Sequence, residues 1–300
     1  MSGLGGGAAA GPTTTGQTVS LPVPTQVRAE VLGTRRVGDY HQLTLVAPGV
    51  PDGARPGQFV AVKVGGPDTA LVTRRALSLA GASGRGPYGG TIELVVAVKG
   101  PGTAWLAGRA PHDQVDVVGP LGRPFLLPRS PAGALLVGGG YGAAPLVWLG
   151  QMLRARGVRV DVVLGAATAD RLYGVLDAKR MATTVAITTE DGSTGTTGRV
   201  TDVLDDMLTR SDADVVYACG PMGMLAAVAS AARAHGVLAQ CAVEESMACG
   251  VGVCMACVLP VTGADGITRM TRTCLEGPVF AADTVRWDAL GTVPPDCLGA

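Results

Sequence analysis

A change in the rhythm of apolar residues near position 130 is the feature that most constrains how this chain can fold. Between Gln26 and about Gly119, six short β-branched runs are separated by Gly and Pro, and several alternate apolar with polar residues. Such runs at hairpin spacing predict an antiparallel sandwich or barrel. Farther along, strand-like runs such as 134–140 alternate with helix-like runs such as 144–157. This alternation predicts a parallel sheet covered by helices.

The length of the chain agrees with more than one domain. Three hundred residues suffice for about two domains and a small module, and the 47% hydrophobic content permits a substantial core. We expect a disordered tail over 1–21, because its Gly, Ala and Thr cannot bury enough surface to order themselves. A β-barrel over 22–130, a Rossmann-like α/β domain over 131–240, and a small module with a C-terminal tail over 241–300 should follow.

Charge and hydropathy exclude several kinds of partner. The 24 basic residues balance 24 acidic ones, so nothing indicates nucleic acid or another polyanion. The N-terminus lacks the basic and apolar regions of a signal peptide. The stretch 133–153 is long enough to span a membrane, but its run of glycines and Pro145 fit a strand, a turn and a helix better. We expect a cytoplasmic protein with no membrane segment.

Four of the seven cysteines form the most specific motif in the chain. Cys249, Cys254 and Cys257 follow a C-x4-C-x2-C pattern, and Cys274 stands alone after sixteen intervening residues. This is the plant-type spacing of four thiolates that hold a 2Fe–2S cluster, and the two glycines inside the loop allow sharp turns. Zinc is the rival metal, although structural zinc usually takes paired C-x2–4-C knuckles. The odd number and uneven spacing of the cysteines argue against a secreted disulfide framework.

Two motifs in the first half could contact a cofactor. Arg75 and Ser78 lie three residues apart at a strand end, where they could bind a phosphate by charge-assisted and hydroxyl hydrogen bonds. An arginine in such a place is more often a solvated edge charge. Gly100, Gly102 and Thr103 form a turn that a ligand could approach closely, and the alternative is an ordinary hairpin.

Two more motifs stand where predicted strands give way to helices. The glycine-rich turn at 138–142 allows a phosphate or a flavin to approach a helix N-terminus, or it is a tight structural turn. It is not the G-x-G-x-x-G dinucleotide fingerprint. Cys219 ends a later strand and Pro221 opens the next helix, so both lie at the ligand-binding edge of an open α/β sheet. A lone buried thiol is the alternative for Cys219.

Taken in order, the R-x-x-S, G-x-G-T, G-G-G-x-G-x-x-P and C-G-P-x-x-M motifs resemble the ferredoxin–NADP reductase superfamily. In that superfamily a β-barrel binds flavin and an α/β domain binds a nicotinamide nucleotide. Three stretches, "TEDGSTGTTGRVTD", "EESMACGVGVCMACV" and "CLEGPVFAAD", more closely resemble the iron–sulfur electron-transfer subunits of type B dihydroorotate dehydrogenases. The resemblance spans about 23–286.

The resemblance implies an oxidoreductase subunit that acts as a relay in de novo pyrimidine (UMP) biosynthesis. A separate FMN-containing catalytic subunit would oxidise dihydroorotate, and electrons would pass through the 2Fe–2S cluster and FAD to NAD⁺. The assembly implied is a heterotetramer of two plus two subunits. The alternative is a relay for a hydrogenase, a sulfite reductase or a ferredoxin-dependent transhydrogenase. A zinc-stabilised scaffold without redox chemistry is a third hypothesis.

The resemblance also implies site residues, and no catalytic acid, base or nucleophile, because the chemistry belongs to the cofactors. The matches to the flavin site are Arg75, Ala76, Leu77, Ser78, Val95, Val96, Ala97, Gly102 and Thr103. The matches on the nicotinamide side are Gly138, Gly139, Gly140, Gly142, Cys219, Gly220, Pro221 and Met222. The matches to the cluster ligands are Cys249, Cys254, Cys257 and Cys274.

Two residues depart from the family pattern, and one stretch bears on the choice of nucleotide. Ala76 stands where the family usually has Pro, and Tyr141 where a small aliphatic residue is common. A 2′-phosphate would require a basic cluster beyond a sheet strand. The stretch "GAATADRLYG" offers only Arg171, so NAD is favoured over NADP.

Overall fold

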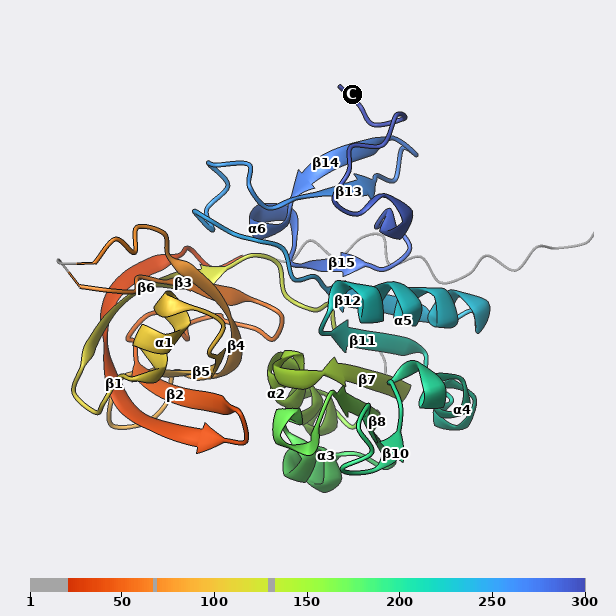
Figure 1. Ribbon diagram of the computed structural model, residues 1–300, viewed down its shortest axis with the longest axis horizontal. Coiled ribbons are helices and arrows are strands. Elements are labelled where there is room, and N and C mark those ends of the chain that lie inside the picture. Colours follow the sequence, from red (N-terminus) through yellow and green to blue (C-terminus); the bar gives the residue numbers. More distant parts are fainter. Residues whose placement is uncertain (1–20, 67–68, 129–132, 300) are drawn as a thin grey trace, which may run out of the picture.

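The computed structural model describes residues 21–66, 69–128 and 133–299. They form a barrel, a helix-covered sheet and a C-terminal module (Figure 1). The barrel, in orange and yellow, lies beside the green sheet, and the blue module extends over both. Of the predicted N-terminal tail, every residue except Leu21 lies outside the described part of the chain.

The first unit is the predicted antiparallel barrel, closed in the strand order β1-β2-β5-β4-β3-β6. Its short strands are rich in β-branched residues, which suit a pleated surface with one buried face. Alternate residues, among them Leu43, Leu45, Ile92 and Leu94, are fully buried in the barrel interior. The strands are β1 (Thr25–Val37), β2 (Tyr40–Val46), β3 (Phe59–Val62), β4 (Arg75–Ser83), β5 (Thr91–Ala97) and β6 (Gln114–Leu121).

Helix α1 (Pro101–Ala107) follows β5, where the sequence indicated only a turn. The Thr103 hydroxyl accepts hydrogen bonds from the N–H groups of Lys99 (2.9 Å) and Gly100 (3.1 Å) and so caps the first turn. Leu106 is fully buried among the barrel core residues. The hairpin alternative is wrong, because this segment begins a helix that packs on the barrel.

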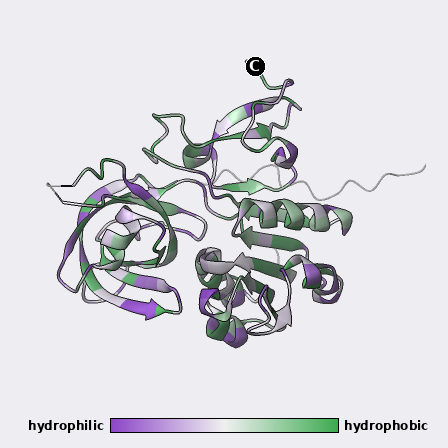
Figure 2. Ribbon diagram, viewed as in Figure 1, coloured by the Kyte–Doolittle hydropathy of each residue, from purple (hydrophilic) through white to green (hydrophobic). Residues whose placement is uncertain are grey.

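The second unit is the predicted α/β domain, a seven-stranded sheet in the order β10-β9-β8-β7-β11-β12-β15. All neighbours are parallel except β12 and β15. Helices α2 and α3 cover one face, and α4 and the mostly hydrophobic α5 cover the other (Figure 2). The strands are β7 (Gly133–Gly139), β8 (Arg159–Ala166), β9 (Val185–Thr189), β10 (Thr196–Thr197), β11 (Val215–Cys219), β12 (Leu238–Ala242) and β15 (Val279–Ala281). The helices are α2 (Ala143–Ala155), α3 (Val175–Met181), α4 (Thr201–Ser211) and α5 (Met222–Ala234).

Local chemistry explains where the helices of this domain begin and end. Pro145 lies in the first turn of α2, where a helix leaves backbone N–H groups unpaired in any case. Gly157, with φ +77°, terminates the helix in the left-handed conformation that favours glycine. Between β8 and α3 no continuous helix forms, because Gly174 has a φ of +76°. The chain therefore forms a 3-10 turn, η2 (Ala169–Arg171), before α3 begins.

The third unit has structure that the apolar pattern did not indicate. Strands β13 (Val258–Thr262) and β14 (Thr268–Arg272) form a hairpin, followed by α6 (Thr273–Glu276) and, after β15, by η3 (Trp287–Ala289). Strand β15 returns to the second unit and pairs antiparallel with β12, Phe280 opposite Cys241. The expected boundary at residue 240 falls inside β12, so the module and the sheet share an edge.

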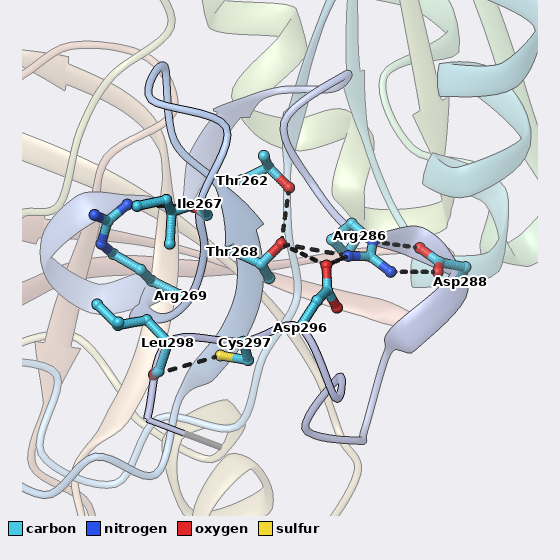
Figure 3. Close-up of polar contacts among 9 residues, drawn as sticks. All are labelled: Thr262, Ile267, Thr268, Arg269, Arg286, Asp288, Asp296, Cys297 and Leu298. Carbon is cyan, nitrogen blue, oxygen red and sulfur yellow. Dashed lines mark hydrogen bonds and ion pairs between the residues drawn. The ribbon is translucent and has the colours of Figure 1, made fainter.

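Arg286 connects the C-terminal segment to this hairpin (Figure 3). Its Nη1 donates to Asp296 (2.8 Å) and to the Thr268 hydroxyl (3.3 Å), while Nε and Nη2 donate to Asp288 (3.0 and 2.9 Å). These hydrogen bonds lower the pKa of both carboxyl groups. The network contributes to stability above their usual pKa near 4, and the contribution is lost as the pH falls through the depressed values.

A buried ion pair in β8 predicts a measurable effect on stability. Asp161 is fully buried, neither carboxylate oxygen has a hydrogen-bond partner in the described structure, and Arg159 Nε lies 3.1 Å from Oδ2. We expect Arg159→Met to lower the free energy of unfolding by about 2–3 kcal/mol, because it leaves an uncompensated buried charge. Chemical denaturation would measure this. Arg156→Met, at the exposed end of α2, is the control and should change stability by less than about 0.5 kcal/mol. Equal, small effects of both substitutions would contradict the prediction.

Candidate functional site

A cavity of about 750 Å³ lies between the barrel, the sheet and the start of the C-terminal module. It opens at the carboxyl ends of β7, β8, β9 and β11, which is where ligands bind in open α/β sheets. The barrel contributes the beginning of β4 and the end of β5. A volume toward the upper part of the usual range, about 300–1,000 Å³, suits a large ligand held between two domains.

The barrel side of the cavity has the features of a phosphate site. It is lined by seven of the residues predicted to hold the flavin: Arg75, Ala76, Leu77, Ser78, Val95, Ala97 and Thr103. Nη1 of Arg75 donates to the carbonyl and hydroxyl of Thr73 (2.8 and 2.7 Å), and among the described residues its Nε and Nη2 have no hydrogen-bond partner. Gly102 does not line the cavity but makes room for this guanidinium, because a Cβ there would lie 2.7 Å from Nε. Two free N–H donors beside Ser78 can bind a phosphate of a dinucleotide.

The sheet side is formed by two glycine turns packed against each other. The cavity is lined here by six of the residues predicted for the nicotinamide side: Gly139, Gly140, Gly142, Cys219, Gly220 and Pro221. A Cβ on Gly139 would lie 2.8 Å from Pro221 Cδ, and a Cβ on Gly142 would lie 2.7 Å from the Cys219 carbonyl oxygen. Side chains at either turn would therefore force the turns apart. Burial raises the pKa of the Cys219 thiol to about 12, and the Glu244 charge adds to this, so the thiol stays neutral at pH 7.

Besides Gly102, three of the residues predicted for the flavin and nicotinamide sites do not line the cavity. Val96 is fully buried in the barrel core. Gly138 lies against Ala143 at the start of α2, and Met222, the first residue of α5, packs against the hydrophobic core on the α4 and α5 side of the sheet. These positions shape the site through the backbone and packing.

A polar cluster at the mouth of the cavity was not predicted. Lys99 Nζ donates to the Tyr141 hydroxyl (2.6 Å), which donates to Glu244 Oε1 (2.5 Å), and Lys99 lies 3.3 Å from the same oxygen. Burial and the neighbouring Glu244 raise the pKa of Tyr141 to about 12, so the phenol stays protonated. The cluster joins the barrel, the glycine turn and the segment after β12. The only signal in the sequence was Tyr141 as a departure from the family pattern.

The cysteine loop holds its thiols in a polar backbone environment. The N–H groups of Val251, Val253 and Cys254 lie 3.4–3.5 Å from Cys249 Sγ. Burial acts to raise the pKa of Cys249, but these N–H groups outweigh it and lower the pKa to about 6. Burial and the adjacent Cys257 thiol raise the pKa of Cys274 to about 12, so a metal that binds it must displace a proton.

The four thiols lie in one neighbourhood. Cys249 lies by Cys254, Cys257 lies by Cys274, and Cys249 is also close enough to Cys274 to act on its pKa. Among the described residues no three His, Cys, Asp or Glu side chains surround one position for a single ion. A 2Fe–2S cluster is held by four cysteine thiolates, and these four neighbouring thiols supply such a donor set.

The cluster loop packs directly against the wall of the cavity. Cys257 and Cys274 are buried in one apolar cluster with Phe59 of β3, and Ala76 of β4 packs against it. Phe59 and Ala76 also line the cavity, and so does Met247, which packs against the same cluster. One layer of side chains therefore lies between two of the cysteines and the cavity.

Two protein-family models match parts of this chain. Residues 136–230 match the oxidoreductase NAD-binding domain, and residues 244–286 match the iron–sulfur cluster binding domain of dihydroorotate dehydrogenase B. Fold and site define an oxidoreductase that joins a nucleotide-binding domain to a cluster-binding module. No helix within the described ranges is both long and apolar enough to cross a membrane.

Relatives with curated names show to which family within this class of oxidoreductases the chain belongs. The dihydroorotate dehydrogenase B (NAD(+)) electron transfer subunit of Bacillus caldolyticus is 43% identical over 248 residues, 82% of this chain and 92% of the relative. A protein of Methanopyrus kandleri named as a probable subunit of the same kind is 36% identical over 93% of this chain and 97% of its own length. The chain belongs to the family of dihydroorotate dehydrogenase B electron transfer subunits, as its sequence motifs predicted.

A solved structure agrees with the fold. It comes from a study of flavin-based electron bifurcation by an NADH-dependent reduced ferredoxin–NADP oxidoreductase. The TM-score is 0.75 at 33% identity, and the match covers 88% of this chain and 91% of the other.

Proposed function

We propose that this chain passes electrons from an FMN-containing dihydroorotate dehydrogenase catalytic subunit through a 2Fe–2S cluster and FAD to NAD⁺. The reaction belongs to de novo pyrimidine (UMP) biosynthesis in the cytoplasm, and the assembly is a heterotetramer of two plus two subunits. Family membership supports the activity. Arg75 and Ser78 hold FAD by a phosphate, the two glycine turns admit the nicotinamide, and the four cysteines hold the cluster.

The packing of the cysteine loop against the cavity wall is the observation that carries this proposal. Phe59 and Ala76 face the cavity and also contact the apolar cluster around Cys257 and Cys274. A cluster at these thiols would lie next to a flavin in the cavity without an intervening domain. Bound FAD supplies the exchange between one-electron and two-electron transfer that a cluster and a nicotinamide require.

The surface around the cluster loop suits a partner subunit. Cys254, in the cysteine loop, is exposed. Around it Val251, Val253 and Met255 are 45%, 79% and 50% exposed, and Leu275 is 37% exposed. Neighbouring exposed apolar residues of this kind mark protein interfaces more often than free surface. A catalytic subunit that covers this patch would bring its own cofactor toward the cluster.

A second candidate is a relay subunit for a different partner. The structural match to the ferredoxin–NADP oxidoreductase supports it, because the match extends over nearly the whole of both chains. The greater identity to the dihydroorotate dehydrogenase subunits, 43% against 33%, favours the first proposal.

The test is dihydroorotate-dependent reduction of NAD⁺ by the native complex, purified without oxygen through this chain. We expect orotate and NADH to appear in equal amounts and an FMN protein to co-purify. A complex that carries flavin and iron but ignores dihydroorotate would contradict the pathway and support the second candidate. A colourless complex with stoichiometric zinc would contradict both.

A further inference from the structure

Beyond the carboxyl ends of β8 and β9, the lining of the cavity includes two arginines and one carboxylate. Arg171 comes from η2, Glu190 directly follows β9, and Arg199 precedes α4 by two residues. The sequence suggested a single basic residue in this region, because Arg199 lies in a different segment from Arg171. Two guanidinium groups by themselves would suit a phosphate.

Each arginine is already paired with a carboxylate. Arg199 Nε lies 3.8 Å from Glu190 Oε1, and Arg171 Nε lies 3.3 Å from Asp39 Oδ2 in the β1–β2 turn. The Arg199 and Glu190 side chains are 76% and 55% exposed, so a ligand can reach both. An anionic group that bound Arg199 would have to approach the Glu190 carboxylate as well.

The loop between β9 and α4 fixes which acid faces the cavity. The N–H of Gly198 donates to the Thr189 carbonyl (2.9 Å), so the ends of the loop that carry Glu190 and Arg199 are held together. The next acid, Asp191, instead accepts hydrogen bonds from the N–H and hydroxyl of Ser193 (3.0 and 2.6 Å) and does not line the cavity. Of these two adjacent acids, only Glu190 lines the cavity.

We propose that Glu190 selects the dinucleotide that lacks a 2′-phosphate. Its carboxylate accepts a hydrogen bond from a ribose hydroxyl, as acidic residues do in NAD sites, and it neutralises Arg199. A 2′-phosphate would place a dianion beside this carboxylate, and like charges brought together in this way disfavour binding. The inference rests on the proposed function, because it identifies which nicotinamide nucleotide the same site accepts.

The test compares Glu190→Gln with Asp191→Asn in the cofactor-loaded chain. Isothermal titration calorimetry gives the Kd of NAD⁺ and NADP⁺, and oxidation of NADH and NADPH with ferricyanide gives a second readout. For Glu190→Gln we expect NADP⁺ to bind about tenfold more tightly and NAD⁺ about threefold more weakly, since a like-charge contact and an acceptor are removed. Asp191→Asn removes the same charge one residue away and should leave both constants unchanged.

A second substitution tests whether Arg199 is the group that binds NADP⁺ more tightly once Glu190 is replaced. In Glu190→Gln combined with Arg199→Ala, the improved binding of NADP⁺ should disappear. The inference would be overturned if the ratio of the NADP⁺ and NAD⁺ Kd values were unchanged in Glu190→Gln, or if Asp191→Asn shifted that ratio equally. In either case, oxidation of NADH by the wild-type chain would leave the proposed function standing. A wild-type chain that binds and oxidises neither nucleotide would overturn both.

Discussion

Replacing Cys254 with Ser is expected to abolish the 2Fe–2S cluster. A serine hydroxyl is a hard ligand that holds its proton much more tightly than a thiol, so it cannot replace a thiolate on iron. Cys254 lies beside Cys249 in the loop, and its loss leaves that pair with one donor. Iron content and visible absorption after purification without oxygen would measure the effect.

The matched control for this experiment is Cys297→Ser. Cys297 is buried in the same C-terminal module but is not one of the four predicted ligands. We expect this variant to retain the full iron content and spectrum. An intact cluster in the Cys254 variant, or its loss in the Cys297 variant, would show that the ligand set is wrong.

Replacing Arg75 with Ala is expected to weaken FAD binding by about 1.5–3 kcal/mol, the contribution of a charge-assisted hydrogen bond. This corresponds to a roughly 10- to 150-fold higher Kd. The physical reason is the pair of guanidinium donors, Nε and Nη2, that Thr73 leaves free. Flavin fluorescence during dilution would measure the dissociation.

Arg74→Ala controls for the removal of a positive charge from the same strand end. Arg74 forms an ion pair with Asp116 (2.6 Å) and does not line the cavity. FAD affinity should stay near the wild-type value in this variant. Equal losses in both variants would indicate a general effect of charge, and full flavin retention in Arg75→Ala would contradict the phosphate assignment.

The architecture could be predicted from the sequence wherever an element is long enough to show a period. The barrel strands and the alternating strands and helices of the sheet met this condition. Helix α1 did not, because its seven residues span about two turns and the helix depends on the burial of Leu106 in the barrel. Strand β15 is only three residues long, and pairing with β12 rather than its own pattern determines its conformation.

The candidate site could be predicted where the residues that form it are close together in the sequence. The cysteine spacing and the glycine turns are local patterns, so they could be identified from the sequence. The Lys99–Tyr141–Glu244 cluster joins residues that are up to 145 positions apart, and no local pattern indicates that they meet. The assignment of Val96 to the flavin site followed the motif, whereas the alternation of β5 turns its side chain into the barrel.

The pairing of β15 with β12 also determines how the nucleotide-binding sheet would behave without its iron–sulfur module, because it covers one edge of that sheet. A chain shortened before residue 244 would leave β12 with a free row of backbone donors and acceptors along Leu238–Ala242. Uncovered edges of this kind recruit other strands, often from a second copy. The barrel and the nucleotide-binding sheet therefore do not form an independent unit that could be transferred intact to another protein. Its solubility as an isolated fragment depends on three residues that come from beyond the cysteine loop.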